Sequence, residues 1–119
     1  MDYHYQDNYM KNLVQKFEDY CLEYEQACIL NDHKIVNKKH DLVQKTFRKI
    51  QKANMLYELL PLLDNENETV RLWVSSRLLP HYEKESRKVL EDIMRNSAVN
   101  NSSAKIILDT YDGKELTFP

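Results

Sequence analysis

Apolar residues recur at steps of three and four along most of the chain, which places them on one face of an α-helix. The first such segment runs from about Asp7 to Leu30. Its inward positions are Leu13, Phe17, Tyr20, Cys21, Tyr24, Ala27 and Cys28. A second helix is expected after the polar stretch Asn31–His33, where Asp32 is placed to cap it. Its inward positions are Ile35, Leu42, Thr46, Phe47, Ile50 and Ala53.

The same spacing resumes at Met55–Leu63, either continuous with the second helix or separated from it by a kink near Ala53–Asn54. After the polar stretch DNENE, Asn67 is a favourable N-cap, and Glu68 suits the positive end of a helix dipole. The helix that follows directs one set of residues inward: Val70, Trp73, Val74, Arg77 and Leu78. We expect Pro80 to end this helix and to push Leu79 out of the helical conformation.

A further helix is expected over about Tyr82–Arg95, followed by the linker-like stretch NSAVNNSSA. The inward positions of that helix are Ser86, Val89, Leu90, Ile93 and Met94. A last helix begins near Ser102 or Ser103 and passes through Ile106, Ile107 and Tyr111. Gly113 closes it in a left-handed conformation. The tail KELTFP, with Leu116 and Phe118, is expected to pack on the body and is the one place where a short extended segment fits.

The composition narrows the class of protein. Hydrophobic residues make up 42% and charged residues 30%, a globular balance, but there is a single glycine. Phosphate-binding loops and hairpin-rich β folds need more glycine than this, so we predict an all-α protein of five or six helices. Residues 1–119 are expected to form one domain with neither a membrane span nor a secretory signal.

No group of residues has the spacing of a catalytic or metal site. His33 and His40 lie seven positions apart, whereas one metal ion joins helical ligands four apart. Cys21 and Cys28 lie about 10 Å apart on one helix, too far for a disulfide, and we expect both to be buried thiols in the cytoplasm. Ser75–Ser76 has no nucleophile elbow around it. We therefore expect no cofactor, no metal and no enzymatic activity.

The stretch LLPLLDNENETVRLWVSSRLLP resembles a HEAT-like repeat, in which two helices flank a short polar turn. Its motif residues are Asp64, Asn67, Val70, Arg71 and Trp73, with Leu59, Leu60, Leu62 and Leu63 before the turn and Val74, Ser75 and Leu78 after it. With Ser103, Ala104, Leu108, Gly113 and Leu116, the pattern is similar to a small bacterial family of HEAT-like proteins known as a domain of unknown function, the one numbered two thousand and nineteen.

The resemblance implies an α-α superhelix of HEAT/armadillo-like helical hairpins and supplies no activity. It also implies that Arg71, close to Asp64, bonds carboxylates or carbonyls of the turn between repeat units. The alternative is an exposed arginine in the first turn of a helix.

Charge is distributed unevenly along the chain. Residues 33–53 contain seven Lys or Arg and one acid, whereas residues 1–32 contain two Lys and seven acids. Five lysines form a row beside the apolar positions of the second helix: Lys34, Lys38, Lys45, Lys49 and Lys52. They are either a docking surface for an acidic protein or a phosphate backbone, or one half of two antiparallel helices whose charges neutralise each other. The second interpretation is favoured, because such pairs are common.

The stacked helices, the lack of a catalytic constellation and the uneven charge favour a non-enzymatic helical module that binds another protein, with the five lysines as its candidate partner-binding residues. A specific version is an immunity-type or antitoxin-type protein that plugs the active site of its partner. The alternative is a nucleic-acid-binding helical-repeat protein that uses the same lysines, although a net charge of −2 disfavours it.

Overall fold

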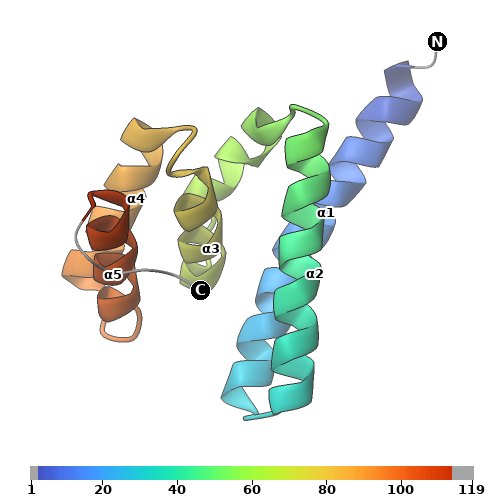
Figure 1. The fold of residues 1–119 in the computed structure, drawn as a ribbon. Coiled ribbons are helices and arrows are strands. Elements are labelled where there is room, and N and C mark those ends of the chain that lie inside the picture. Colours follow the sequence, from blue (N-terminus) through green and yellow to red (C-terminus); the bar gives the residue numbers. More distant parts are fainter. Residues whose placement is uncertain (1–2, 114–119) are drawn as a thin grey trace. The chain divides into compact units, whose positions relative to one another are not determined.

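The computed structural model describes residues 3–113, with side chains from residue 8 onward. Five α-helices and one 3-10 helix make up this part of the chain, which contains no strand (Figure 1). They are α1 (Tyr3–Ile29), α2 (His33–Lys52), η1 (Leu56–Asp64), α3 (Glu68–Leu78), α4 (Glu83–Asn96) and α5 (Asn101–Tyr111). The predicted all-α class, with five or six helices, is confirmed. The expectations for the tail KELTFP lie outside the described residues.

The chain forms two compact units, Met1–Pro61 and Leu62–Pro119. That all 119 residues make one domain stays a prediction. In the first unit, α1 and α2 pack against each other as an antiparallel hairpin (Figure 1). Its buried residues are Met10, Leu13, Phe17, Cys21 and Ala27 from α1, and Val43, Thr46, Phe47 and Ile50 from α2. Buried Thr46 is satisfied because its hydroxyl donates to the Leu42 carbonyl oxygen at 2.7 Å.

Three predicted inward positions of this hairpin are exposed: Cys28, Ile35 and Ala53. Each lies in a terminal turn of α1 or α2 or just beyond it, where a side chain is more open to solvent than at the centre of the hairpin. The expectation that both cysteines are buried is therefore wrong for Cys28 and correct for Cys21. Val43, which the spacing did not select, is fully buried at the centre of α2.

Two asparagines end the long helices. Asn31 and Asn54 both have φ of 57°, the left-handed region that most side chains avoid. After Asn31, the amide of Asp32 donates to the Ala27 carbonyl at 3.0 Å. After Asn54, the amide of Met55 donates in the same way to the Ile50 carbonyl at 3.2 Å. These are Schellman motifs, in which a left-handed residue satisfies the last helical carbonyls and turns the chain away.

The segment after Asn54 is therefore separate from α2, which settles the alternatives left open by the sequence. It forms η1, a 3-10 helix containing Pro61. Leu56, Leu59 and Leu62 are buried and lie three residues apart. A 3-10 helix has three residues per turn, so this spacing aligns the three leucines on one side.

The second unit contains α3, α4 and α5, and α4 packs against both other helices. Asn67 caps α3 as predicted, because its side chain accepts the Val70 amide at 3.0 Å. Val70, Trp73, Val74 and Leu78 are buried as predicted, and the Arg77 guanidinium lies 4.1 Å from the centre of the Trp73 ring. One core cluster of this unit combines Leu90 and Ile93 of α4 with Leu79, which follows α3, and with Ala104 and Leu108 of α5.

The expectation for Leu79 is wrong. It precedes Pro80 yet keeps helical angles, with φ −51° and ψ −46°. Proline disfavours this conformation in the preceding residue without forbidding it. Leu79 is 1% exposed, and burying a leucine contributes about 1.5–3 kcal/mol, enough to outweigh the preference.

Glu68, the first residue of α3, ties that helix to the loop between α4 and α5. One of its carboxylate oxygens accepts from the Ser97 hydroxyl at 2.5 Å and from the Asn100 side-chain amide at 2.8 Å. The Ser97 oxygen in turn accepts the backbone amide of Asn100 at 2.8 Å. The linker-like stretch is thus a hydrogen-bonded turn, and α5 begins at Asn101, just before the predicted serines.

The far end of α5 is also fixed. Gly113 has φ of +82°, which confirms its predicted left-handed conformation. The Arg87 guanidinium donates to both carboxylate oxygens of Asp112, at 3.2 and 2.6 Å. Two-pronged pairing of this kind holds the end of α5 on α4.

Replacing Asn54 by Ala is expected to lower the stability of the hairpin by about 1 kcal/mol, because a left-handed conformation is costly for an ordinary residue. Asn54→Gly should leave stability unchanged or raise it, since glycine adopts positive φ freely. Urea unfolding followed by far-ultraviolet circular dichroism, with amide exchange in the last turn of α2, measures both. Gln51→Ala, an exposed change in the same turn, is the control. Equal losses for the two Asn54 variants would contradict this interpretation.

Replacing Glu68 by Gln is expected to destabilise the second unit by about 1 kcal/mol, because both hydrogen bonds lose their charged acceptor. Trp73, the one tryptophan of the chain, lies in this unit, so its fluorescence during urea unfolding reports on it. Glu85→Gln removes a charge from the first turn of α4 at an exposed position and is the matched control. A loss no larger than that of the control would show that the Ser97 and Asn100 contacts contribute little.

Candidate interaction surface on α2

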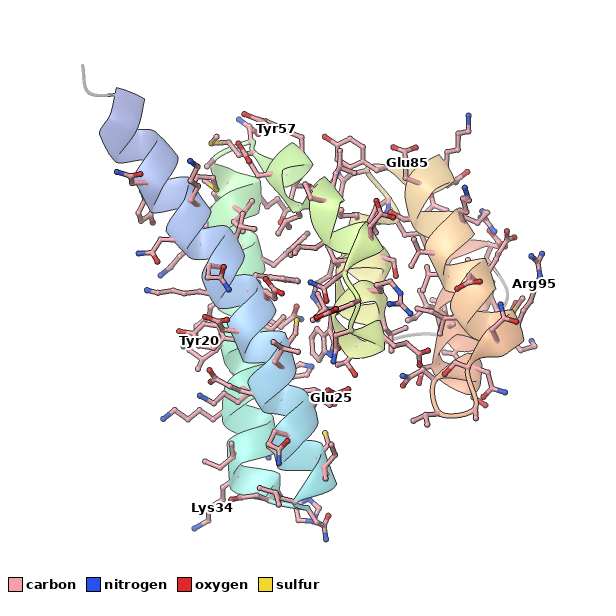
Figure 2. The ribbon with its side chains drawn as sticks, turned by 180° about the vertical axis from the view of Figure 1, so that it is seen from behind. Tyr20, Glu25, Lys34, Tyr57, Glu85 and Arg95 are labelled. Atoms are coloured by element: carbon pink, nitrogen blue, oxygen red, sulfur yellow. The ribbon has the colours of Figure 1, made fainter. Side chains whose placement is uncertain are left out.

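The five lysines singled out by the sequence all lie on α2 and are all exposed. We call Lys34, Lys38, Lys45, Lys49 and Lys52 the lysine face. At 100° per residue they fall within an arc of about 60°, on the side of α2 opposite Val43 and Ile50. At ~1.5 Å per residue the row is about 27 Å long. In Figure 2, Lys34 marks the end of the row nearest the turn and points outward from the hairpin.

Charge neutralisation between α1 and α2 involves a different lysine. Lys39, which is half-buried, lies 2.5 Å from a Glu23 carboxylate oxygen and 5.6 Å from the centre of the Tyr20 ring. Within residues 8–113, no lysine of the lysine face forms an ion pair with the protein. Asp41 is the one acid of α2 and lies 3.8 Å from the imidazole of His40. The neutralisation alternative therefore accounts for Lys39 and leaves the lysine face unpaired.

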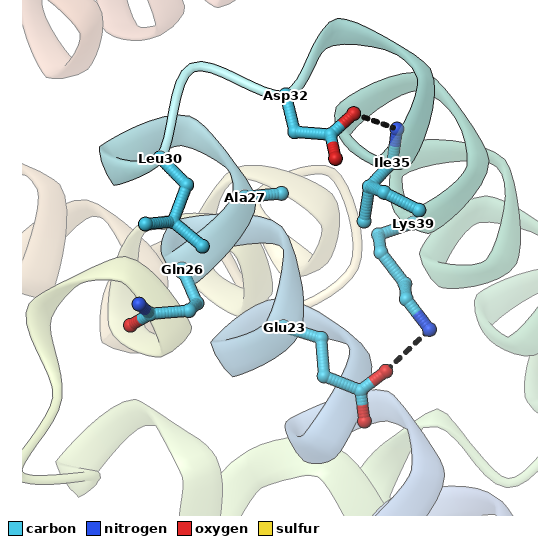
Figure 3. Close-up of a pocket in the computed structure, with 7 residues that line it drawn as sticks. All are labelled: Glu23, Gln26, Ala27, Leu30, Asp32, Ile35 and Lys39. Carbon is cyan, nitrogen blue, oxygen red and sulfur yellow. Dashed lines mark hydrogen bonds and ion pairs between the residues drawn. The ribbon is translucent and has the colours of Figure 1, made fainter.

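An open hollow lies between α1 and α2 near their connecting turn (Figure 3). Ala27, Leu30 and Ile35 give it an apolar lining. Its polar residues are Glu23, Gln26, Asp32 and Lys39. Glu23 is held by Lys39, and the Asp32 carboxylate accepts the Ile35 amide at 3.2 Å, which is the predicted cap of α2.

The same turn exposes large apolar side chains. Ile29 is 70% exposed and Leu30 is 68% exposed. Sequence reasoning did not select these residues or the hollow, although a signal was present. Ile29 and Leu30 are adjacent apolar residues beyond the last inward position of α1, so helical spacing cannot bury both.

The repeat-motif residues lie together at the start of α3. Arg71 donates to the carbonyl oxygens of Asn65 at 2.7 Å and of Glu66 at 3.1 Å, and its side chain is half-buried. The expected bond to turn carbonyls is present, but it is local, since both carbonyls belong to the turn that precedes its own helix. Asp64 is exposed and makes no ion pair with Arg71 within the described residues.

The second unit carries one cluster of ionisable groups, formed by α4 and the end of α5. A hydrogen bond to Glu83 raises the pKa of Tyr111, and the hydrogen bond to Asp112 raises the pKa of Arg87. All four groups lie at the surface and join the two helices. Residues 8–113 contain no group of three His, Cys, Asp or Glu side chains arranged to hold a metal ion. In the described part of the chain, no helix is long and apolar enough to cross a membrane.

Comparison with known proteins identifies the fold alone. No family model and no curated protein matches the chain. Among solved structures, it is similar to the protein RPA1889 from Rhodopseudomonas palustris CGA009, with a TM-score of 0.83 and 20% sequence identity. The similarity covers 92% of this chain and 93% of that chain. The helical fold described above is therefore shared with a bacterial protein of known structure.

Proposed function

We propose that this chain is a non-catalytic module that binds another protein through the lysine face of α2. The observation that carries the proposal is the row of five exposed lysines, none of which is paired within the described structure. Aligned like charges repel one another, and a partner with a complementary acidic surface relieves that repulsion and is attracted from a distance.

Nucleic-acid binding is the second candidate, because the lysine face is straight, about 27 Å long, and therefore suited to following a phosphate backbone. The net charge of −2 disfavours it, since nucleic-acid-binding domains are usually basic overall. The acids of α1 lie in the same hairpin and weaken attraction of a polyanion at long range.

We extend the proposal to the family, the type of partner and the cellular compartment of this chain. The α1–α2 hairpin and the packing of α4 on α3 and α5 support membership of the HEAT-like family of unknown function. A lysine face that covers the acidic active site of a partner suits an immunity-type or antitoxin-type role. Cys21 and Cys28 are not joined in a disulfide, which suits a reducing compartment such as the cytoplasm.

Charge reversal tests the proposal directly. The wild-type chain is used to capture stoichiometric partners from a lysate of its native host. We expect Lys45→Glu combined with Lys49→Glu to reduce recovery of the partner at least about tenfold, because reversal replaces attraction with repulsion. Lys84→Glu combined with Lys88→Glu is the matched control: both are exposed, four residues apart, and on α4. Equal loss in the two variants, or no partner with the wild type, would overturn the proposal.

The nucleic-acid alternative has its own signature. Fluorescence anisotropy with a short DNA duplex and a single-stranded RNA, at low and physiological salt, measures it. If phosphates are the ligand, the affinity falls steeply as the salt concentration rises. The Lys45/Lys49 double reversal then reduces the slope of log affinity against log salt concentration. We expect only weak binding at low salt. Tight duplex or RNA binding at physiological salt would favour the alternative.

A further inference from the structure

We infer that the lysine face and the adjacent hollow form one binding site, and that its ligand is an acidic amphipathic helix of the partner protein. One large apolar side chain of that helix occupies the hollow, and its carboxylates lie along the lysines. The inference rests on the proposed function and adds to it the chemistry of the partner.

Ile35 joins the two parts of this site. It lines the hollow and is 38% exposed. Lys34 precedes it, and Lys38 is its neighbour one turn further along α2, since residues three apart lie side by side on a helix. A ligand that inserts a side chain beside Ile35 therefore has its next turn next to two unpaired lysines.

The polar rim of the hollow is compatible with an acidic ligand. Its two carboxylates already have partners within the hairpin: Glu23 pairs with Lys39, and Asp32 accepts the Ile35 amide at the N-terminus of α2. The positive end of the helix dipole further offsets the charge of Asp32. Lys34, which precedes Ile35, carries a charge with no ion-pair partner within the described residues.

The apolar lining distinguishes a protein ligand from other polyanions. Ala27, Leu30 and Ile35 can be covered by an aliphatic or aromatic side chain, whereas a nucleic-acid backbone presents only sugar and phosphate. Leu30 and Ile29 are among the most exposed large apolar residues described, and a ligand that covers them removes apolar surface from water. A row of about 27 Å corresponds to a partner helix of about 18 residues, which would present anchors at helical spacing as in helix-in-groove binding.

The test uses the full chain, labelled with nitrogen-15, and three synthetic helical peptides of about 18 residues. The first carries glutamates along one face and a leucine at the end that meets the hollow. The second replaces this leucine by serine, and the third replaces the glutamates by glutamine. Amide shifts locate the peptide, and their concentration dependence gives its affinity. Vesicles of phosphatidylcholine and phosphatidylglycerol and a short DNA duplex are titrated in parallel.

We expect the acidic leucine peptide to shift amides of residues 26–52 and to bind at least about tenfold more tightly than either of the other peptides. Leu30→Ser in the protein should abolish the advantage of leucine over serine. Val99→Ser, which changes an apolar residue 84% exposed in a loop of the second unit, should not. Lys45→Glu combined with Lys49→Glu should weaken binding of both acidic peptides.

Two results would overturn the inference and separate it from the proposed function. Equal binding of the leucine and serine peptides, or no shift at the hollow with any peptide, removes the hollow from the site. The proposed function stands in that case if lysine-dependent capture of a partner persists. Tighter binding of vesicles or duplex than of any peptide removes both the inference and the proposed function.

Discussion

The position of the lysine face follows from the burial of Val43, Phe47 and Ile50, which leave water because α1 lies along α2. Each buried side chain of this size contributes about 1.5–3 kcal/mol, whereas an exposed ion pair contributes about 1 kcal/mol or less. The apolar contacts therefore set the rotation of α2 about its axis. Once that rotation is set, Lys45 and Lys49 point to solvent whatever the distribution of acids on α1.

The ends of the helices determine where the exposed apolar groups lie. The chain has one glycine, the residue that usually adopts the left-handed conformation after a helix. At the ends of the two long helices this conformation is adopted by asparagine instead. At Asn31 this turn reverses the chain directly after Ile29 and Leu30, so neither helix has another turn with which to cover them. The hollow and the exposed apolar residues are a consequence of how α1 ends.

Periodicity was sufficient to predict the helical class and most of the inward residues of α3 and α4, because each of these helices packs on neighbours within the second unit. It failed at Cys28 and Ile35, since phase alone does not show where a neighbouring helix ends. It also could not identify Asn54 as a Schellman residue, because asparagine is favoured at N-caps and in turns as well as at left-handed C′ positions. At the candidate site, the lysines were predictable from local composition. The hollow was not, because residues from two helices line it.

The two cysteines of α1 differ in their access to solvent, which has a practical consequence. Cys21 is fully buried and Cys28 is exposed in the last turn of the helix. A maleimide or a nitroxide reagent will therefore modify the native protein at Cys28, which follows Ala27 of the hollow in the sequence, without any engineered substitution. The same accessibility makes purified protein prone to covalent dimerisation through Cys28 when it is stored without a reductant.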